Sequence, residues 1–294
     1  MSDRRGEILA EAVTGPVPRR DVVVDTGELS LHCVIWGDDA DPPVLLIHGN
    51  GAHAHWWDTL VPALTRDHRL LAVDLRGHGS SEWPAEIAYR LADYERDLVE
   101  LLDALAEGPV PIIAHSMGGR AALWLAAHQP ARVAGVAVVD SSLGEVGGPE
   151  VEAFREKVRE RRMGGPYASY ASAMATYRLV PDEPGVPEEV LRDVAHHAIT
   201  EREPGDWRVC FDRGVLLGDG EGNMWDLIAK LQCPLRVAYA QGAGIEQLGV
   251  IELLEHFPEV PTRLFPGGHH FLLAHSEPLG SWLREFLREV TPGS

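Results

Sequence analysis

From Pro42 onward, short apolar runs alternate along the chain with longer amphipathic or alanine-rich stretches. This alternation predicts parallel strands connected by helices. The apolar runs are short and uniformly apolar, as expected for strands that are buried on both faces of a sheet. In the first half of the chain the candidate strands cover residues 44–47, 70–73, 111–114 and 133–139. We therefore predict an α/β fold.

Two helices and a hairpin complete the predicted first half. Residues 91–105 carry leucines at helical spacing with charged residues on the opposite face, which predicts a helix packed on the surface of the core. Residues 121–127 (AALWLAA) are apolar all round, as in a helix buried inside the fold. Residues 21–36 contain two apolar runs around Thr26-Gly27-Glu28, which indicates an antiparallel hairpin at one edge of the sheet.

The pattern changes after Ser142. A glycine-rich break spans residues 144–148, and residues 151–230 contain helical stretches without a strand pattern. The core pattern then resumes with a strand at 235–239, a helix at 246–256, a strand at 262–265 and a helix at 279–290. We expect a core in two parts, residues 1–143 and 231–294, divided by a helical cap of residues 144–230.

Composition narrows the classes of function. Of the 294 residues 45% are hydrophobic, which is enough for a large core. Lys and Arg total 26 against 45 Asp and Glu, and the net charge of −19 disfavours binding to nucleic acid or to anionic membranes. No apolar run approaches the roughly 20 residues of a membrane span, and the first residues are too charged for a secretion signal. We expect a cytoplasmic protein with a small-molecule substrate and without nucleic-acid or membrane partners.

The three cysteines carry no metal or disulfide pattern. Cys33, Cys210 and Cys233 are far apart, and none belongs to a CxxC or Cys/His cluster. A disulfide framework and a structural zinc site are therefore excluded, and no metal site is predicted.

The strongest chemical signal is the stretch IIAHSMGG at residues 112–119, where an apolar strand runs through Ser116 into the buried helix. A nucleophile elbow needs this strand–turn–helix order, with small residues two positions on either side of the serine. Ala114 and Gly118 meet that demand, although AxSxG departs from the usual GxSxG. The alternative interpretation is a small-residue turn that only packs a helix onto a strand.

A second glycine-rich turn follows the first parallel strand and reads HGNG at residues 48–51. Such a turn can direct a backbone N–H toward a reaction centre, as can the N–H of a residue that begins a helix. We predict Asn50 and Met117 as the two donors of an oxyanion hole. On its own, the turn is also compatible with an ordinary strand-to-helix connection.

These motifs in this order, HGNG, then DLRGHGSS at residues 74–81, then AHSMGG, then a cap, then GGHH, resemble the capped branch of the α/β-hydrolase family, which includes esterases, C–C hydrolases and epoxide hydrolases. The resemblance implies a sheet of about eight mostly parallel strands, catalysis at the carboxyl ends of those strands, and no cofactor. DLRGHGSS is interpreted as a structural turn.

A general base is expected after the last strand, where the sequence FPGGHHF offers two neighbouring histidines. Adjacent loop side chains point in different directions, so only one imidazole can face the serine. The resemblance favours His269, and His270 remains the alternative.

The third member of the triad departs from the family. Most relatives carry an aspartate after the first strand that follows the cap, and this chain has Ala243 there. Asp140, at the end of the strand 133–139, can replace it, because that strand is expected beside the strand 235–239 and relatives resembling haloalkane dehalogenases place the acid there. Glu246 is the runner-up, and the absence of any acid is a third interpretation.

The leading hypothesis is a serine hydrolase in which Ser116, His269 and Asp140 cleave an ester, thioester, lactone or activated C–C bond of a small apolar molecule. A serine nucleophile disfavours epoxide hydrolysis and dehalogenation, which need an alkyl–carboxylate intermediate. Two other hypotheses stay open: a non-hydrolytic cyclase or lyase of a biosynthetic pathway, suggested by Ala243, and a receptor-like module that only binds its ligand.

Overall fold

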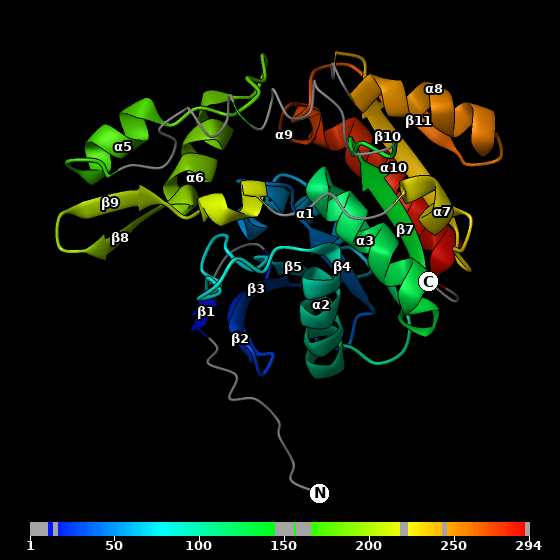
Figure 1. Cartoon of the computed structure of the whole chain (residues 1–294), viewed down its shortest axis with the longest axis horizontal. Helices are drawn as coiled ribbons and strands as arrows, with labels where there is room; N and C mark the ends of the chain where they lie inside the picture. The colour runs from blue at the N-terminus through cyan, green and yellow to red at the C-terminus, as the bar shows by residue number, and fades with distance from the viewer. Residues whose placement is uncertain are drawn as a thin grey trace, which may run out of the picture.

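The protein is built around one large twisted sheet (Figure 1). A computed structural model describes residues 11–13, 17–144, 156, 166–217, 223–242 and 246–291. In spatial order the strands are β1 (Glu11–Val13), β2 (Arg19–Asp25), β3 (Ser30–Trp36), β5 (Arg69–Val73), β4 (Pro43–Ile47), β6 (Val110–His115), β7 (Val133–Val139), β10 (Leu235–Ala240) and β11 (Thr262–Phe265).

Within the described part of the chain, the six strands from β5 to β11 in this order run parallel, and β1, β2 and β3 are antiparallel to their neighbours. The predicted sheet of about eight mostly parallel strands is confirmed, and the short β1 brings the number to nine. The edge hairpin predicted within residues 21–36 is β2 and β3.

Side chains alternate between two apolar layers, one on each face of the sheet. On β4, Leu45 and Ile47 enter one layer, whereas Val44 and Leu46 enter the other. The first layer is covered by α2 (Leu91–Leu105), α3 (Met117–His128) and α7 (Met224–Ile228). The second is covered by α1 (Val61–Leu64), α9 (Phe271–Ala274) and α10 (Ser276–Val290). Figure 1 accordingly shows α2 and α3 in front of the sheet and α10 behind it.

The long segment between β7 and β10 is inserted between two strands that are neighbours in the sheet. Its described elements are α5 (Tyr170–Thr176), α6 (Glu188–Ala198), β8 (Ile199–Glu203), β9 (Asp206–Val209) and the short 3-10 helix η3 (Arg213–Leu217), followed by α7. Figure 1 shows α5, α6, β8 and β9 grouped to one side of the sheet.

The expectation that the inserted segment contains no strand was wrong, because β8 and β9 form an antiparallel hairpin. Their sequences, ITERE and DWRV, are largely polar and the residues are mostly exposed or half-buried, so they lack the apolar runs that mark the core strands. Gly205 lies in the turn that joins them and has a φ of +83°, a conformation that favours glycine. The expected limits of the cap, 144 and 230, stay a prediction, and residues 145–148 of the predicted glycine-rich break lie outside the described residues.

Among the residues that the structure describes, no helix has the length and apolar character needed to cross a membrane.

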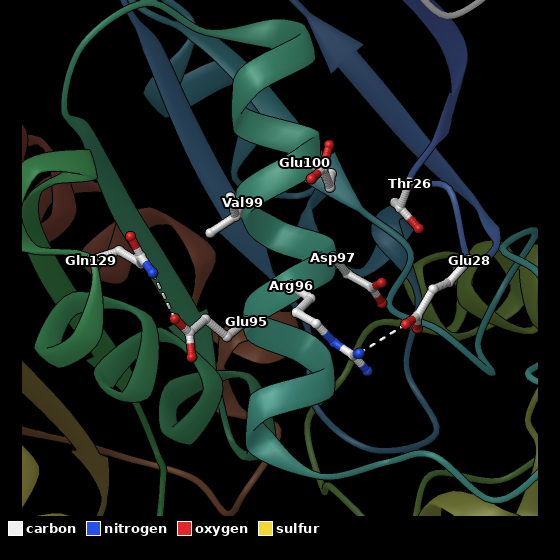
Figure 2. A pocket seen from close by; sticks show the side chains of 8 residues that line it. All are labelled: Thr26, Glu28, Glu95, Arg96, Asp97, Val99, Glu100 and Gln129. Atoms are coloured by element: carbon white, nitrogen blue, oxygen red, sulfur yellow. Dashed lines mark hydrogen bonds and ion pairs between the residues drawn. The ribbon is translucent and has the colours of Figure 1, made fainter.

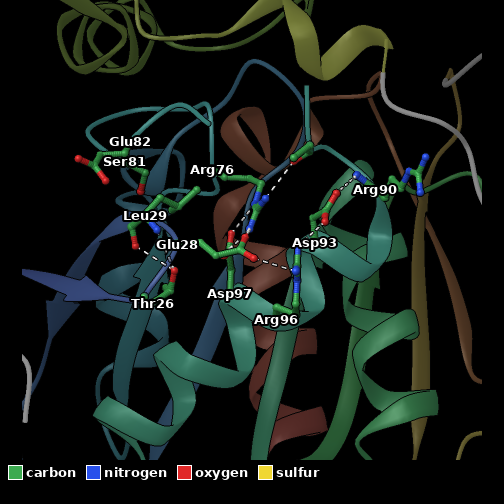
Figure 3. A network of polar contacts seen from close by, with 12 residues as sticks. Thr26, Glu28, Leu29, Arg76, Ser81, Glu82, Arg90, Asp93, Arg96 and Asp97 are labelled. Atoms are coloured by element: carbon green, nitrogen blue, oxygen red, sulfur yellow. Dashed lines mark hydrogen bonds and ion pairs between the residues drawn. The ribbon is translucent and has the colours of Figure 1, made fainter. Parts of the chain in front are cut away.

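The DLRGHGSS turn is held by buried charges. Asp74 accepts hydrogen bonds from the backbone N–H groups of Ala54 and Ser80, which ties two loops together. Arg76 makes a bidentate ion pair with Asp97 of α2, at 2.7 and 2.6 Å (Figure 3). These contacts support the interpretation of this motif as a structural turn.

His32 on β3 lies between two carboxylates. Its Nδ1 is 2.8 Å from Asp74 Oδ2, and its Nε2 is 3.0 Å from Asp21 Oδ1. Burial by itself would lower the pKa of His32, but the hydrogen bonds to Asp21 and Asp74 outweigh it and raise the pKa to about 9. The imidazole is therefore protonated at neutral pH and donates to both carboxylates.

Because the pKa of His32 is higher in the folded than in the unfolded state, its stabilisation is complete below pH 6.5 and is lost as the pH rises through about 9. We predict that the contribution of His32 to the free energy of unfolding, measured in urea, falls by up to about 3 kcal/mol between pH 6.5 and about 9. His32→Gln should remove that slope, whereas His256→Gln on the exposed end of α8 (Glu246–His256) should keep it. Equal slopes in wild type and His32→Gln would contradict the assignment.

Candidate active site

Ser116 occupies the sharp turn between β6 and α3. Its backbone has φ +53° and ψ −124°, a left-handed conformation that a side-chain-bearing residue rarely adopts. The Ser116 N–H donates to the carbonyl of Val139 at the end of β7, at 3.0 Å. A Cβ on Gly118 would lie 2.5 Å from the carbonyl oxygen of His48 and 2.6 Å from that of Ile47. A glycine two positions after the serine is therefore required, because α3 comes very close to the loop after β4.

His269 lies in the loop after β11 and faces Ser116. Its Nε2 is 2.9 Å from Ser116 Oγ, and its Nδ1 is 2.7 Å from Asp140 Oδ2. Since a carboxylate only accepts hydrogen bonds, Nδ1 carries the proton and Nε2 is left to accept the hydroxyl proton of the serine. The arrangement joins a hydroxyl, an imidazole and a carboxylate in one hydrogen-bonded chain.

Asp140 follows β7 directly and is fully buried. Its backbone also has a positive φ, +47°, and its Oδ1 accepts the N–H of Ala240 at the end of β10, at 2.7 Å. Burial raises the pKa of Asp140 above its usual value, and the hydrogen bond from His269 opposes that rise. Both carboxylate oxygens are thus occupied, which fixes the orientation of the acid.

Glu246, the runner-up candidate for the acid, is not tested by the described residues. Ala243 lies outside the residues that the structure describes. Glu246 begins α8, and its side chain is likewise outside the description.

Two further imidazoles surround His269. His115 and His270 are both buried, with ring centroids 4.9 and 4.8 Å from that of His269. Burial, followed by the neighbouring His269, lowers the pKa of His270 to about 3, and the same causes hold the pKa of His115 well below its usual value. Both rings are therefore neutral at pH 7, and the His270 ring packs edge-on against Trp56.

The loop after β4 lies against the serine. A Cβ on Gly49 would be 2.7 Å from the Cβ of Ser116, so the turn that continues into Asn50 packs against the serine. Met117 is the first residue of α3, and its N–H belongs to the first turn, whose N–H groups have no partner within the helix. The turn that continues into Asn50 and the first turn of α3 thus both lie next to Ser116, and the two donors of the oxyanion hole stay a prediction.

Two residues of this site, His115 and Glu183, were not predicted from the sequence. The Nε2 of His115 lies 2.9 Å from the carbonyl oxygen of His269, and Glu183 of the inserted segment accepts backbone N–H groups of the same loop. His115 precedes the serine in the elbow, so its position was a usable signal. Glu183 stands in a polar stretch that has no local motif.

A second group of histidines lies at the boundary between the core and the inserted segment. His53 and His55 are only 2% and 7% exposed, and both contact the segment around α6. His53 Nε2 is 3.0 Å from the carbonyl oxygen of Val194, and the ring of His55 stacks on that of His197 at 3.5 Å.

Among the described residues, two groups have ligand atoms close enough together to be considered for a metal ion. They are His115, His269 and His270 at the serine, and His55, Asp58 and His197 at the boundary, with ligand atoms within 4.8 Å of one another in each group. The first group includes the imidazole that contacts Ser116.

One cavity of the described part lies away from all of these residues. It has a volume of about 220 Å³ and is lined mainly by acidic and polar side chains of α2 and the β2–β3 turn (Figure 2). None of the predicted site residues lines it.

Comparison with known proteins places the chain in a family. Residues 42–168 match the family model described as the alpha/beta hydrolase fold. An esterase of Mycobacterium tuberculosis is 30% identical, with 79% of this chain and 76% of the relative covered. A fluoroacetate dehalogenase of a Burkholderia species is 25% identical, with 92% and 94% covered.

Among solved structures, a thioesterase domain from the curacin biosynthetic pathway superposes with a TM-score of 0.77 at 19% identity, over 90% of this chain and 99% of that domain. This likeness concerns the fold. The matching family model, the extent of the esterase match and the parallel sheet with its serine turn lead to one conclusion: the chain belongs to the α/β-hydrolase family of enzymes.

Proposed function

We propose that the protein is a serine hydrolase in which Ser116 is the nucleophile, His269 the general base and Asp140 the acid that orients the base. The observation that carries this proposal is the continuous hydrogen-bonded chain from Ser116 Oγ through the His269 ring to Asp140, with distances of 2.9 and 2.7 Å. A nucleophile within hydrogen-bond reach of a base that is itself held by a third group is the arrangement needed for covalent acyl transfer.

The reaction follows from the positions of these atoms. His269 Nε2 removes the proton of Ser116 as Oγ attacks the acyl carbon, and the carbonyl π electrons move onto its oxygen. The backbone N–H groups of Asn50 and Met117 stabilise that oxyanion. When the intermediate collapses, the bond to the leaving group breaks and His269 returns the proton to it. Water, deprotonated by His269, then attacks the acyl-enzyme. The bond between the acyl carbon and Oγ breaks as this second intermediate collapses, His269 returns the proton to Ser116 Oγ, and the acid is released.

Asp140 acts on the base and not on the substrate. By accepting the Nδ1 proton, it keeps Nε2 free in the resting enzyme, and it stabilises the imidazolium that forms after proton transfer. Its second oxygen is held by Ala240 N–H, so a small movement of the ring does not carry the carboxylate with it.

For the substrate we propose an ester of a small apolar molecule, with thioesters, lactones and activated C–C bonds as members of the same acyl-transfer class. The relative named an esterase supports the ester. Another relative is named a dehalogenase. Dehalogenation needs an alkyl–carboxylate intermediate, and the residue at the elbow is a serine and not an aspartate, so we do not propose this reaction. The cyclase or lyase hypothesis began from the missing acid at Ala243, and the contact of Asp140 with His269 favours hydrolysis instead.

We also keep the helical cap over the site and the cytoplasmic location as proposals.

The nucleophile can be tested with a covalent probe. We predict that a fluorophosphonate labels the wild-type protein and that Ser116→Ala abolishes both labelling and the hydrolysis of a short-chain p-nitrophenyl ester, because the substitution removes the hydroxyl that lies 2.9 Å from His269 Nε2. Labelling of both proteins to the same extent would reject Ser116. Ligand binding without labelling or turnover in the wild type would favour the receptor-like module.

The acid can be tested with an isosteric change. Asp140→Asn should lower kcat for the same ester by about 10³- to 10⁴-fold, because an amide NH₂ cannot accept the Nδ1 proton and selects the wrong tautomer. His270→Gln is the comparison variant, and it should retain at least about a tenth of the activity, since His270 stays neutral and its ring contacts Trp56. A loss of less than tenfold in Asp140→Asn would mean that another group orients His269.

The close packing around Gly118 can be tested by its effects on stability and on labelling. Gly118→Ala places a Cβ against two backbone oxygens and should lower the free energy of unfolding by about 1–3 kcal/mol and slow fluorophosphonate labelling. In Gly144→Ala, the Cβ meets the movable end of the Glu252 side chain at 3.2 Å, so labelling should not change. An unaltered labelling rate in Gly118→Ala would show that α3 can move away from the β4 loop without disturbing the serine.

A further inference from the structure

The loop that carries His269 is held by a carboxylate from the inserted segment. Glu183, between α5 and α6, is only 5% exposed. Its Oε1 accepts the N–H of Gly268 at 2.8 Å, and its Oε2 accepts the N–H of His270 at 2.9 Å. We propose that Glu183 is a positioning residue for His269, and that it makes the alignment of the base depend on docking of the inserted segment.

The two glycines before His269 make room for this carboxylate. A Cβ on Gly267 would lie 3.0 Å from Glu183 Oε1, and a Cβ on Gly268 would lie 2.9 Å from Oε2. Gly267 also has a φ of +104°, which disfavours any side chain. The Gly-Gly pair thus has a specific steric role: it lets the carboxylate reach the backbone on both sides of the base.

The same loop is also held by residues of the core. Gly242 N–H donates to the carbonyl of Gly267 at 3.0 Å, and His115 Nε2 lies 2.9 Å from the carbonyl oxygen of His269. The two hydrogen bonds accepted by Glu183, by contrast, come from the inserted segment. Glu183 therefore connects the placement of that segment to the placement of the imidazole.

The contact is expected to be strong. A carboxylate that accepts two N–H groups makes charge-assisted hydrogen bonds, which are about twice as strong as neutral ones. If the segment undocked, the two N–H groups would lose their acceptor, and the loop would be held only from the core. A displacement of a catalytic group by about 1 Å can cost on the order of 100-fold in rate, so a modest loosening of this loop has a measurable effect.

This inference rests on the proposed role of His269 and can be tested apart from it. With a p-nitrophenyl ester, Glu183→Ala should lower kcat by about 10- to 100-fold with KM changed less than about threefold, and Glu183→Gln should lose less because its amide oxygen still accepts one N–H. The matched control is Asp182→Asn, a charge removal at the exposed neighbouring position, which should leave kcat unchanged.

A double-mutant cycle separates positioning from a general effect on folding. Gly268→Ala in the wild type should displace the Glu183 carboxylate and reduce kcat to a similar extent, because its Cβ would lie 2.9 Å from Oε2. In the Glu183→Ala background the same substitution meets no carboxylate and should cause little further loss. The rates are compared well below the melting temperature of each variant, so that all proteins are folded.

The outcomes are distinct. Non-additive losses of kcat in the cycle, with the rate of fluorophosphonate labelling falling in parallel, support the proposal. If the losses of kcat in the two single variants multiply in the double variant, the residues act independently and the proposal is overturned. It is also overturned if kcat stays within twofold of wild type in both Glu183 variants. If Glu183→Ala does not fold, Gly268→Ala and Glu183→Gln keep the test decisive. If Ser116→Ala keeps full activity, it is the proposed function that fails, whatever the Glu183 variants do.

Discussion

The hydrogen bond between His269 Nδ1 and Asp140 joins groups that lie 129 residues apart, and the chemistry of the site depends on it. It determines which nitrogen of His269 carries the proton and which faces Ser116. The carboxylate is fully buried, so an unpaired charge there would be costly, and its second oxygen is satisfied by a backbone N–H of β10. The acid is thereby oriented before any substrate binds.

The order of the strands makes this bond available. Asp140 follows β7, which lies between β6, whose end leads into Ser116, and β10, whose end receives the carboxylate. Since these strands are parallel, their carboxyl ends meet at one edge of the sheet, where the loop after β11 also brings His269. An acid at the end of β7 can therefore take a place that a residue after β10 would otherwise fill.

Much of this arrangement was predictable from local signals. The central strands β4, β5, β6 and β7 are the apolar runs expected of strands buried on both faces, and β7 and β11 have the predicted limits. Ser116 and His269 stand in short motifs with small neighbours: two backbone oxygens leave no room for a side chain at Gly118, and the Glu183 carboxylate leaves little at Gly268. By contrast, the β8–β9 hairpin is polar and exposed and lacks an apolar pattern, so it was not predicted. The contacts of Glu183, and the burial of His53 and His55 under the segment around α6, arise from tertiary placement, which periodicity does not encode.

The tautomer of His269 in the resting enzyme tests the account most directly. With ¹⁵N-labelled histidine, two-dimensional NMR at a pH where the ring is neutral distinguishes protonated Nδ1 from protonated Nε2. The account predicts a proton on Nδ1 that is shielded from exchange, with Nε2 unprotonated toward Ser116. A ring protonated at Nε2, or one that exchanges freely between the two forms, would contradict it.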